Sequence, residues 1–130
     1  MNHANSPFKS KGGLLRLAGA LRYSAQGFKA ALLHEAAFRQ ELFAFVLLTP
    51  VAIWLGESLA ERALLIGALF FVLIVELLNS AIEALADTIT LDHHPMIGRA
   101  KDLGSAAVML SIGLAILIWT MVIISHVLPS

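Results

Sequence analysis

The segment IVELLNSAIEAL, residues 74–85, places two carboxylates and an amide in an otherwise apolar helix. Glu76, Asn79, Glu83 and Asp87 follow one another at spacings of three, four and four residues. On a helix these side chains share one face that spans roughly 80°. A charge at the centre of a membrane helix costs on the order of 3 kcal/mol, and such residues usually face a bundle interior and serve function. An aligned acidic face therefore indicates a functional site rather than simple polar contacts between helices.

The composition of the whole chain is that of a membrane protein. Of its 130 residues, 58% are hydrophobic and 14% are charged, and the mean hydropathy is +0.82. A soluble domain of this length could not bury so much apolar surface, and the length indicates a single domain over residues 1–130. The absence of cysteine excludes a disulfide framework and thiolate chemistry. Nucleic acid is a poor fit as a partner, although the first third of the chain is basic.

The periodicity predicts an amino-terminal surface helix followed by three membrane-spanning helices. Residues 1–12 are expected to be flexible, and residues 14–33 carry apolar side chains at helical spacing, with basic residues elsewhere on the wheel. Apolar runs predict spans at about 36–56, 62–87 and 103–127, the length that a bilayer requires. GESLAERA at 56–63 is expected to be a turn. DTITLDHHPMIGRAKD at 87–102 is expected to be a loop, because Pro95 and Gly98 break helices.

The distribution of basic residues predicts the orientation in the membrane. Six Lys or Arg precede the first apolar run, the second loop adds Arg99 and Lys101, and the first loop has only Arg62. The positive-inside rule therefore places the amino terminus and the second loop in the cytoplasm and the carboxy terminus outside. In this orientation Asp87 lies near cytoplasmic water and Glu76 is the deepest acid.

The residue types on the acidic face indicate phosphoryl transfer. Carboxylates beside an amide suit a hard cation such as Mg²⁺ bound together with substrate phosphates. A deep, partly desolvated carboxylate such as Glu76 can accept a proton. Arg16, Arg99 and Lys101 on neighbouring segments can attract phosphate. A proton or cation pathway, which would also line a bundle with acids, is the alternative from the residues alone.

Three motifs on three segments give the chain a specific resemblance. HEAAFRQE at 34–41, ELLNSAIEA at 76–84 and GRAKDLGSAAV at 98–108 together resemble the small bacterial diacylglycerol kinase family. Order and spacing match essentially without gaps from about Arg16 to His126. The EAAFRQE form is more similar to the Gram-negative enzyme than to the related undecaprenol kinase.

The resemblance implies an integral-membrane homotrimer of the bacterial inner membrane, with active sites shared between subunits. The implied reaction transfers the γ-phosphate of ATP to diacylglycerol, giving phosphatidic acid, and the carboxy terminus would be periplasmic. Glu76 would be the catalytic base, with Asn79 supporting the site. Glu35 and Glu83 would hold the Mg²⁺ that accompanies ATP. Undecaprenol or another lipid alcohol remains an alternative acceptor, and a small proton- or ion-conducting protein remains the alternative from another class.

The resemblance also implies the residues that contact each substrate. ATP would be bound by Arg16, Tyr23, Glu35, Glu83, Asp92, His94, Lys101 and Asp102. The membrane lipid substrate would be bordered by Arg16, Glu41, Trp54, Glu76, Ser105 and Trp119. The chain departs from the family pattern at Gly19, Gln26, Asp92 and His93, which affects headgroup and adenine contacts rather than the chemistry.

Overall fold

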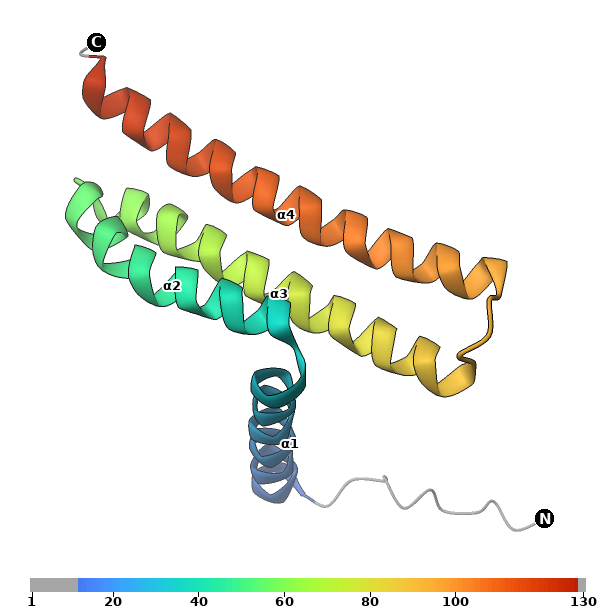
Figure 1. Cartoon of the computed structure of the whole chain (residues 1–130). Helices are drawn as coiled ribbons and strands as arrows, with labels where there is room; N and C mark the ends of the chain where they lie inside the picture. The colour runs from blue at the N-terminus through green and yellow to red at the C-terminus, as the bar shows by residue number, and fades with distance from the viewer. Residues whose placement is uncertain (1–11, 129–130) are drawn as a thin grey trace. The chain divides into compact units, whose positions relative to one another are not determined.

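The structure is a computed structural model that describes residues 12–128, in which every regular element is a helix (Figure 1). The helices are α1 (Gly13–His34), α2 (Ala36–Leu55), α3 (Leu59–Ile89) and α4 (Pro95–Val127). The predicted all-α class and the predicted number of helices are therefore confirmed over the described range. Helix α1 forms one unit and α2–α4 form another. The predicted flexible segment lies outside the described residues, except for its last position.

Helix α1 has the amphipathic pattern that its sequence predicts. Its large apolar side chains are exposed, with Leu14, Leu17, Leu21 and Phe28 between 51% and 84% accessible. Arg16 is exposed as well. A helix that carries both apolar and basic side chains on its surface suits the interface of a bilayer. Its location at the membrane surface stays a prediction.

Helix α2 is the shortest apolar helix, and it contains Pro50. Proline removes one backbone donor from the helical ladder, yet the helix continues through it for five residues to Leu55. At the end of α2, Gly56 donates its N–H to Ala52 O at 3.0 Å. A Cβ at Gly56 would lie 2.6 Å from Arg62 Cγ, so this turn requires glycine. Arg62 Nε donates to Gly56 O at 2.9 Å and closes the turn.

The turn predicted at 56–63 is wrong in its second half, because α3 already begins at Leu59. Ser58 is the N-cap, and its Oγ accepts the N–H of Glu61 at 3.1 Å. Glu61 Oε2 in turn accepts the N–H of Glu57 at 2.8 Å. The Ser58 cap satisfies one of the donors that a helix start leaves unpaired, and the Glu61 side chain holds the preceding residue in place, so helix formation begins immediately after Ser58.

The loop predicted at 87–102 is also wrong in its extent, because α4 begins at Pro95 rather than near residue 103. Proline is favoured at the first helical position, where its missing N–H has no partner to lose. His94 is the N-cap, and its Nδ1 accepts the N–H of Met96 at 3.3 Å. Lys101 therefore lies on a helix rather than in a loop.

Three of the helices are long and apolar enough to cross a membrane, as predicted. Helix α2 has 20 residues, and α3 and α4 have 31 and 33. At 1.5 Å per residue, α3 and α4 measure about 46 and 50 Å, well above the roughly 30 Å of a hydrocarbon core. Phe43, Phe70 and Leu110, one on each helix, leave 52–72% of their surface exposed, as side chains that face lipid would.

Helix α3 lies between α2 and α4 and packs against both (Figure 1). Small side chains allow the close approach: Ala52 packs with Leu65 in one cluster, and Ala68 with Ala115 in another. Trp119 Nε1 donates to Leu65 O at 3.2 Å, which ties α4 to α3. Helix α3, the central helix of this unit, is also the helix that carries the acidic face.

Candidate active site

The acidic face of α3 changes from buried to exposed along its length. Glu76 and Asn79 are 4% and 8% exposed. Glu83 is half-buried, and the side chain of Asp87 is 56% exposed. The helix is unbroken through these positions, so the shared face predicted from their spacing is confirmed. Glu76 is therefore shielded while Asp87 is accessible from outside the bundle.

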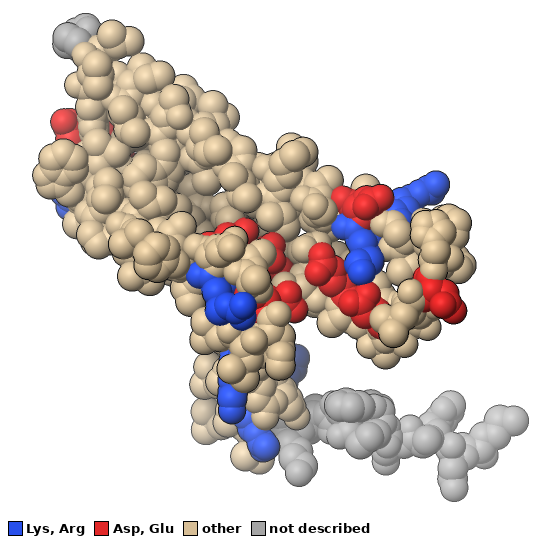
Figure 2. Space-filling view, in the orientation of Figure 1, with Lys and Arg blue, Asp and Glu red and all other residues tan. Residues whose placement is uncertain are grey.

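Carboxylates from two helices and the link before α2 converge on Glu76. The charges of Glu83 and Glu35 both act on Glu76, and the charge of Glu76 acts on Glu41. In Figure 2, acidic side chains extend from the middle of the α2–α4 unit to the end where α3 and α4 join, and the surface toward the other end is largely uncharged. Close like charges are stable together only if protons or cations compensate them. The cluster of carboxylates therefore suits a site that binds protons and cations.

Asn79 connects the acidic face to α4. Its Nδ2 donates to Glu83 Oε1 at 3.2 Å. Its Oδ1 is buried and has no hydrogen-bond partner. On α4 it faces Gly104, where an added Cβ would overlap Oδ1. Asn79 is thus held between a carboxylate on its own helix and the backbone of the next.

The donor atoms fit a magnesium ion that arrives with phosphate. Among the residues that the structure describes, no three His, Asp or Glu side chains are grouped to hold a metal by themselves. Mg²⁺ is usually bound by one or two carboxylates together with phosphate oxygens and waters, so such a group is not required. The charges of Glu35 and Glu83 both act on Glu76, and these two residues supply the carboxylate oxygens that Mg²⁺ prefers. Their role as metal ligands stays a prediction.

A cavity of about 290 Å³ lies at the end of the unit where α3 and α4 join. Lys101 Nζ contacts Asp87 Oδ1 at 2.9 Å beside it, and the charge of Glu83 also acts on Lys101. The lining includes three residues that the resemblance predicts to contact ATP, namely Asp92, His94 and Lys101. His93 lines the same cavity. A basic side chain is therefore placed between a small polar cavity and the exposed end of the acidic face.

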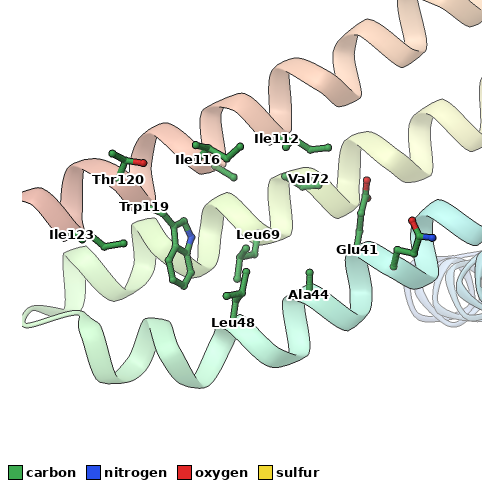
Figure 3. A pocket seen from close by; sticks show the side chains of 12 residues that line it. Glu41, Ala44, Leu48, Leu69, Val72, Ile112, Ile116, Trp119, Thr120 and Ile123 are labelled. Carbon is green, nitrogen blue, oxygen red and sulfur yellow. The ribbon is translucent and has the colours of Figure 1, made fainter.

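A second cavity, of about 480 Å³, is an open groove lined by residues of α2, α3 and α4, and its lining is almost entirely apolar. Figure 3 shows Glu41 at one end of it, Thr120 and Ile123 at the other, and Trp119 along its length. Glu41 Oε2 is buried and has no hydrogen-bond partner. An elongated apolar cavity with one carboxylate end suits a lipid whose polar end carries a hydroxyl group.

The structure leaves several predicted site residues outside these two cavities. Trp54 is 83% exposed, Ser105 and Asp102 are exposed, and none of the three lines either cavity. Arg16 and Tyr23 lie on α1, which belongs to the other unit, and both are exposed there. Their assignments to ATP or lipid stay predictions.

Sequence reasoning missed two contacts that the structure reveals. The Lys101–Asp87 pair joins α4 to α3 through two residues that are 14 positions apart in sequence. Asp87 was visible as the last member of the acidic face, but its partner was not. The contact of Gly104 with Asn79 depends on the register between α3 and α4, which one sequence does not display.

Comparison with known proteins gives matches over most of the chain. Residues 22–123 match the family model described as prokaryotic diacylglycerol kinase. The chain is 46% identical to the diacylglycerol kinase of Escherichia coli (strain K12) over 114 residues, which cover 88% of this chain and 93% of that protein. It is 47% identical to the diacylglycerol kinase of Pseudomonas aeruginosa over 119 residues, which cover 92% and 97%. The diacylglycerol kinase of Helicobacter pylori (strain 26695) is 38% identical over 119 residues, which cover 92% of each chain.

The family match includes the lining of both cavities and most of the three apolar helices, and the similarity covers almost the full length of these relatives. Three apolar helices and bacterial relatives of the same length make this a bacterial integral membrane protein. The chain belongs to the prokaryotic diacylglycerol kinase family.

Proposed function

We propose that the protein transfers the γ-phosphate of ATP to diacylglycerol and so produces phosphatidic acid at the cytoplasmic face of the bacterial inner membrane. The observation that carries this proposal is the graded acidic face, which joins an apolar cavity at its buried end to a polar cavity at its exposed end. Relatives named diacylglycerol kinase, at 46% and 47% identity, support the choice of acceptor.

The apolar cavity is the proposed site of the lipid. Its lining would accept acyl chain, and its single carboxylate end, at Glu41, would accept a hydrogen bond from the glycerol part. Glu41 lies within electrostatic range of Glu76. A lipid hydroxyl at that end of the cavity would therefore lie near Glu76 without leaving the membrane.

The polar cavity is the proposed site of part of ATP. Lys101 lies at its edge as a compact positive charge, which suits phosphate. Asp92 and His94 line the same cavity and would contact the nucleotide, with Asp102, Arg16 and Tyr23 as further contacts from the family resemblance. Glu83 is close enough for its charge to act on Lys101, so polyphosphate bound there would face the acidic site.

Glu35 and Glu83 are the residues that would hold Mg²⁺ brought in with ATP. When bound, the ion would neutralise charge on the phosphate oxygens. Asn79 would keep Glu83 in place through its hydrogen bond to Oε1, which leaves the second carboxylate oxygen for another partner.

The proposed chemistry is a direct displacement at the γ-phosphorus. The hydroxyl oxygen of diacylglycerol forms a bond to this phosphorus, and its proton passes to the Glu76 carboxylate. The bond between the phosphorus and the β–γ bridging oxygen breaks, and ADP leaves. Holding the two substrates in this geometry supplies a large part of the rate, because little covalent chemistry is left to the protein.

We extend the proposal to a homotrimer with shared active sites and a cytoplasmic amino terminus. Within one chain, Trp54 and Ser105 do not reach the lipid cavity, which is the arrangement expected if a neighbouring subunit presents them. The excess of Lys and Arg before α2 and near the start of α4 supports the orientation.

An acceptor panel tests the proposed function. Purified protein would be mixed with γ-labelled ATP, Mg²⁺ and micelles that contain diacylglycerol, undecaprenol or no added lipid. The expected result is label in phosphatidic acid with little in the other products. Preferential labelling of undecaprenol would make the protein a kinase of a different lipid alcohol.

A magnesium titration tests the assignment of the metal ligands. Glu83→Gln and Glu35→Gln are each expected to raise the Mg²⁺ concentration that gives half-maximal activity, because each loses one carboxylate oxygen charge. Glu57→Gln is the control, because its side chain is 78% exposed and lines neither cavity. Titrations that coincide with that of the parent would remove Glu35 and Glu83 from the metal site.

A further inference from the structure

We propose that Gly104 is a positioning residue for the acidic site, because its missing side chain leaves the space on α4 that the amide oxygen of Asn79 occupies. The kinetic part of this inference rests on the proposed function, whereas the structural part does not. Gly104 does not line either of the two cavities, so it would act on the site through Asn79.

The contact between the two residues is close and specific. A Cβ built at Gly104 would overlap Asn79 Oδ1 and would lie 3.4 Å from Asn79 Cγ. The next atom, Ile82 Cδ1, would be 3.7 Å away, which is an ordinary van der Waals distance. Asn79 is therefore the one side chain that a methyl group at this position would displace. Gly104 is itself buried, so the methyl group could not turn toward solvent.

The hydrogen bond to Glu83 fixes which amide atom faces Gly104. Asn79 Nδ2 donates to Glu83 Oε1 at 3.2 Å, and the reversed amide would bring two acceptors together at that distance. Oδ1 must then lie against α4, where it is buried without a conventional donor. A glycine Cα–H is the group that can approach such an oxygen most closely. Removing this space would turn or shift the amide and release Glu83.

Other glycines of the same region do not have this role. Gly113, on the same helix, has no atom within 4 Å of the position of an added Cβ, and neither has Gly98. General close packing of helices by small residues would affect several positions on α4 alike. Gly113→Ala therefore serves as the matched control: the same substitution, on the same helix, in open space.

Side-chain amide NMR tests the geometry without an activity assay. The sequence has three asparagines, Asn2, Asn5 and Asn79, so selective ¹⁵N labelling of asparagine gives few signals, and Asn79→Ala assigns the relevant one. Gly104→Ala is expected to displace the Asn79 amide signal and to abolish its response to Glu83→Gln. Gly113→Ala should leave both unchanged. An unmoved Asn79 signal in Gly104→Ala would overturn the positioning role.

A stability cycle covers the case in which Gly104→Ala folds poorly. The substitution is expected to lower the unfolding temperature when residue 79 is Asn and to have little effect in an Asn79→Ala background, since the overlapping atom is gone. Equal loss in both backgrounds would show that Gly104 is needed for helix packing alone, and would refute the positioning role.

Kinetics then connects the contact to the proposed reaction. Gly104→Ala should raise the KM for Mg²⁺·ATP about tenfold to a hundredfold, with a short-chain diacylglycerol saturating, as loss of an outer-shell partner of a metal ligand usually does. The KM for diacylglycerol should change much less. A parent protein that fails to phosphorylate diacylglycerol would refute the proposed function but leave the NMR and stability results standing. A normal Mg²⁺·ATP KM in Gly104→Ala would refute the positioning role alone.

Discussion

Replacing Glu76 by Gln should abolish catalysis while leaving the protein more stable. The substitution keeps the size of the side chain and removes one negative charge. Glu76 is 4% exposed, and the charges of Glu83, Glu35 and Glu41 all interact with it. A buried carboxylate surrounded by other carboxylates is held at a cost in folding free energy, and functional sites commonly carry such a cost.

The substitution is expected to lower activity and to raise stability. A positioned general base contributes about 10²- to 10⁴-fold in rate, so its removal should raise the activation free energy by about 2.7–5.5 kcal/mol. Removing the unfavourable charge should raise the free energy of unfolding by about 0.5–2 kcal/mol, the usual gain from relieving a strained functional site. The new amide can donate to a neighbouring carboxylate, so it is not left without a partner.

Two measurements on the same preparation check this prediction. Lipid-dependent ADP release in mixed micelles gives the rate, and reversible unfolding in denaturing detergent gives the stability. Glu57→Gln is the control, because its side chain is 78% exposed at the opposite end of the helices. Parent-like turnover by Glu76→Gln would show that this residue is not the base. Loss of both activity and stability would show that Glu76 is structural.

Four further substitutions examine a helix contact, a helix cap and the polar cavity. Lys101→Gln should raise the KM for ATP roughly tenfold or more through loss of a charged phosphate contact, whereas Asp87→Asn, which removes only its exposed partner, should leave that KM within a fewfold of the parent. Trp119→Phe deletes the bond to Leu65 O and should lower the free energy of unfolding by about 1 kcal/mol, measured by detergent titration; an unchanged value would mean that this bond is neutral. Ser58→Ala removes the N-cap of α3 and should lower stability by about 1 kcal/mol with normal kcat, and altered kcat would contradict a purely structural cap.

The parts of the fold that depend on local periodicity could be predicted from sequence. The three apolar runs predict three spanning helices, and the spacing of Glu76, Asn79 and Glu83 predicts their shared face. The predicted starts of α3 and α4 were less accurate, although the sequence contains signals for both. SLAE at 58–61 has the form of a capping box, which starts α3 where a turn was predicted. Pro95 can end one helix or begin another, and only the cap by His94 decides between them.

The parts of the site that depend on how helices face one another could not be predicted in this way. Contacts such as Asn79 with Gly104, and Lys101 with Asp87, require the rotation and register of α4 against α3. The apolar cavity likewise arises from three helices together, and no segment alone contains it. The chemistry of each residue was readable from sequence, whereas its partners were not.

Transfer of label from ATP to diacylglycerol by purified protein in lipid nanodiscs tests the central claim most directly, with the parent and Glu76→Gln measured side by side. The expected result is ³²P from γ-labelled ATP in phosphatidic acid for the parent, and at least a hundredfold less for the variant. The contradicting result is equal labelling of the lipid by both proteins, or ion flux through the membrane with no label in lipid at all.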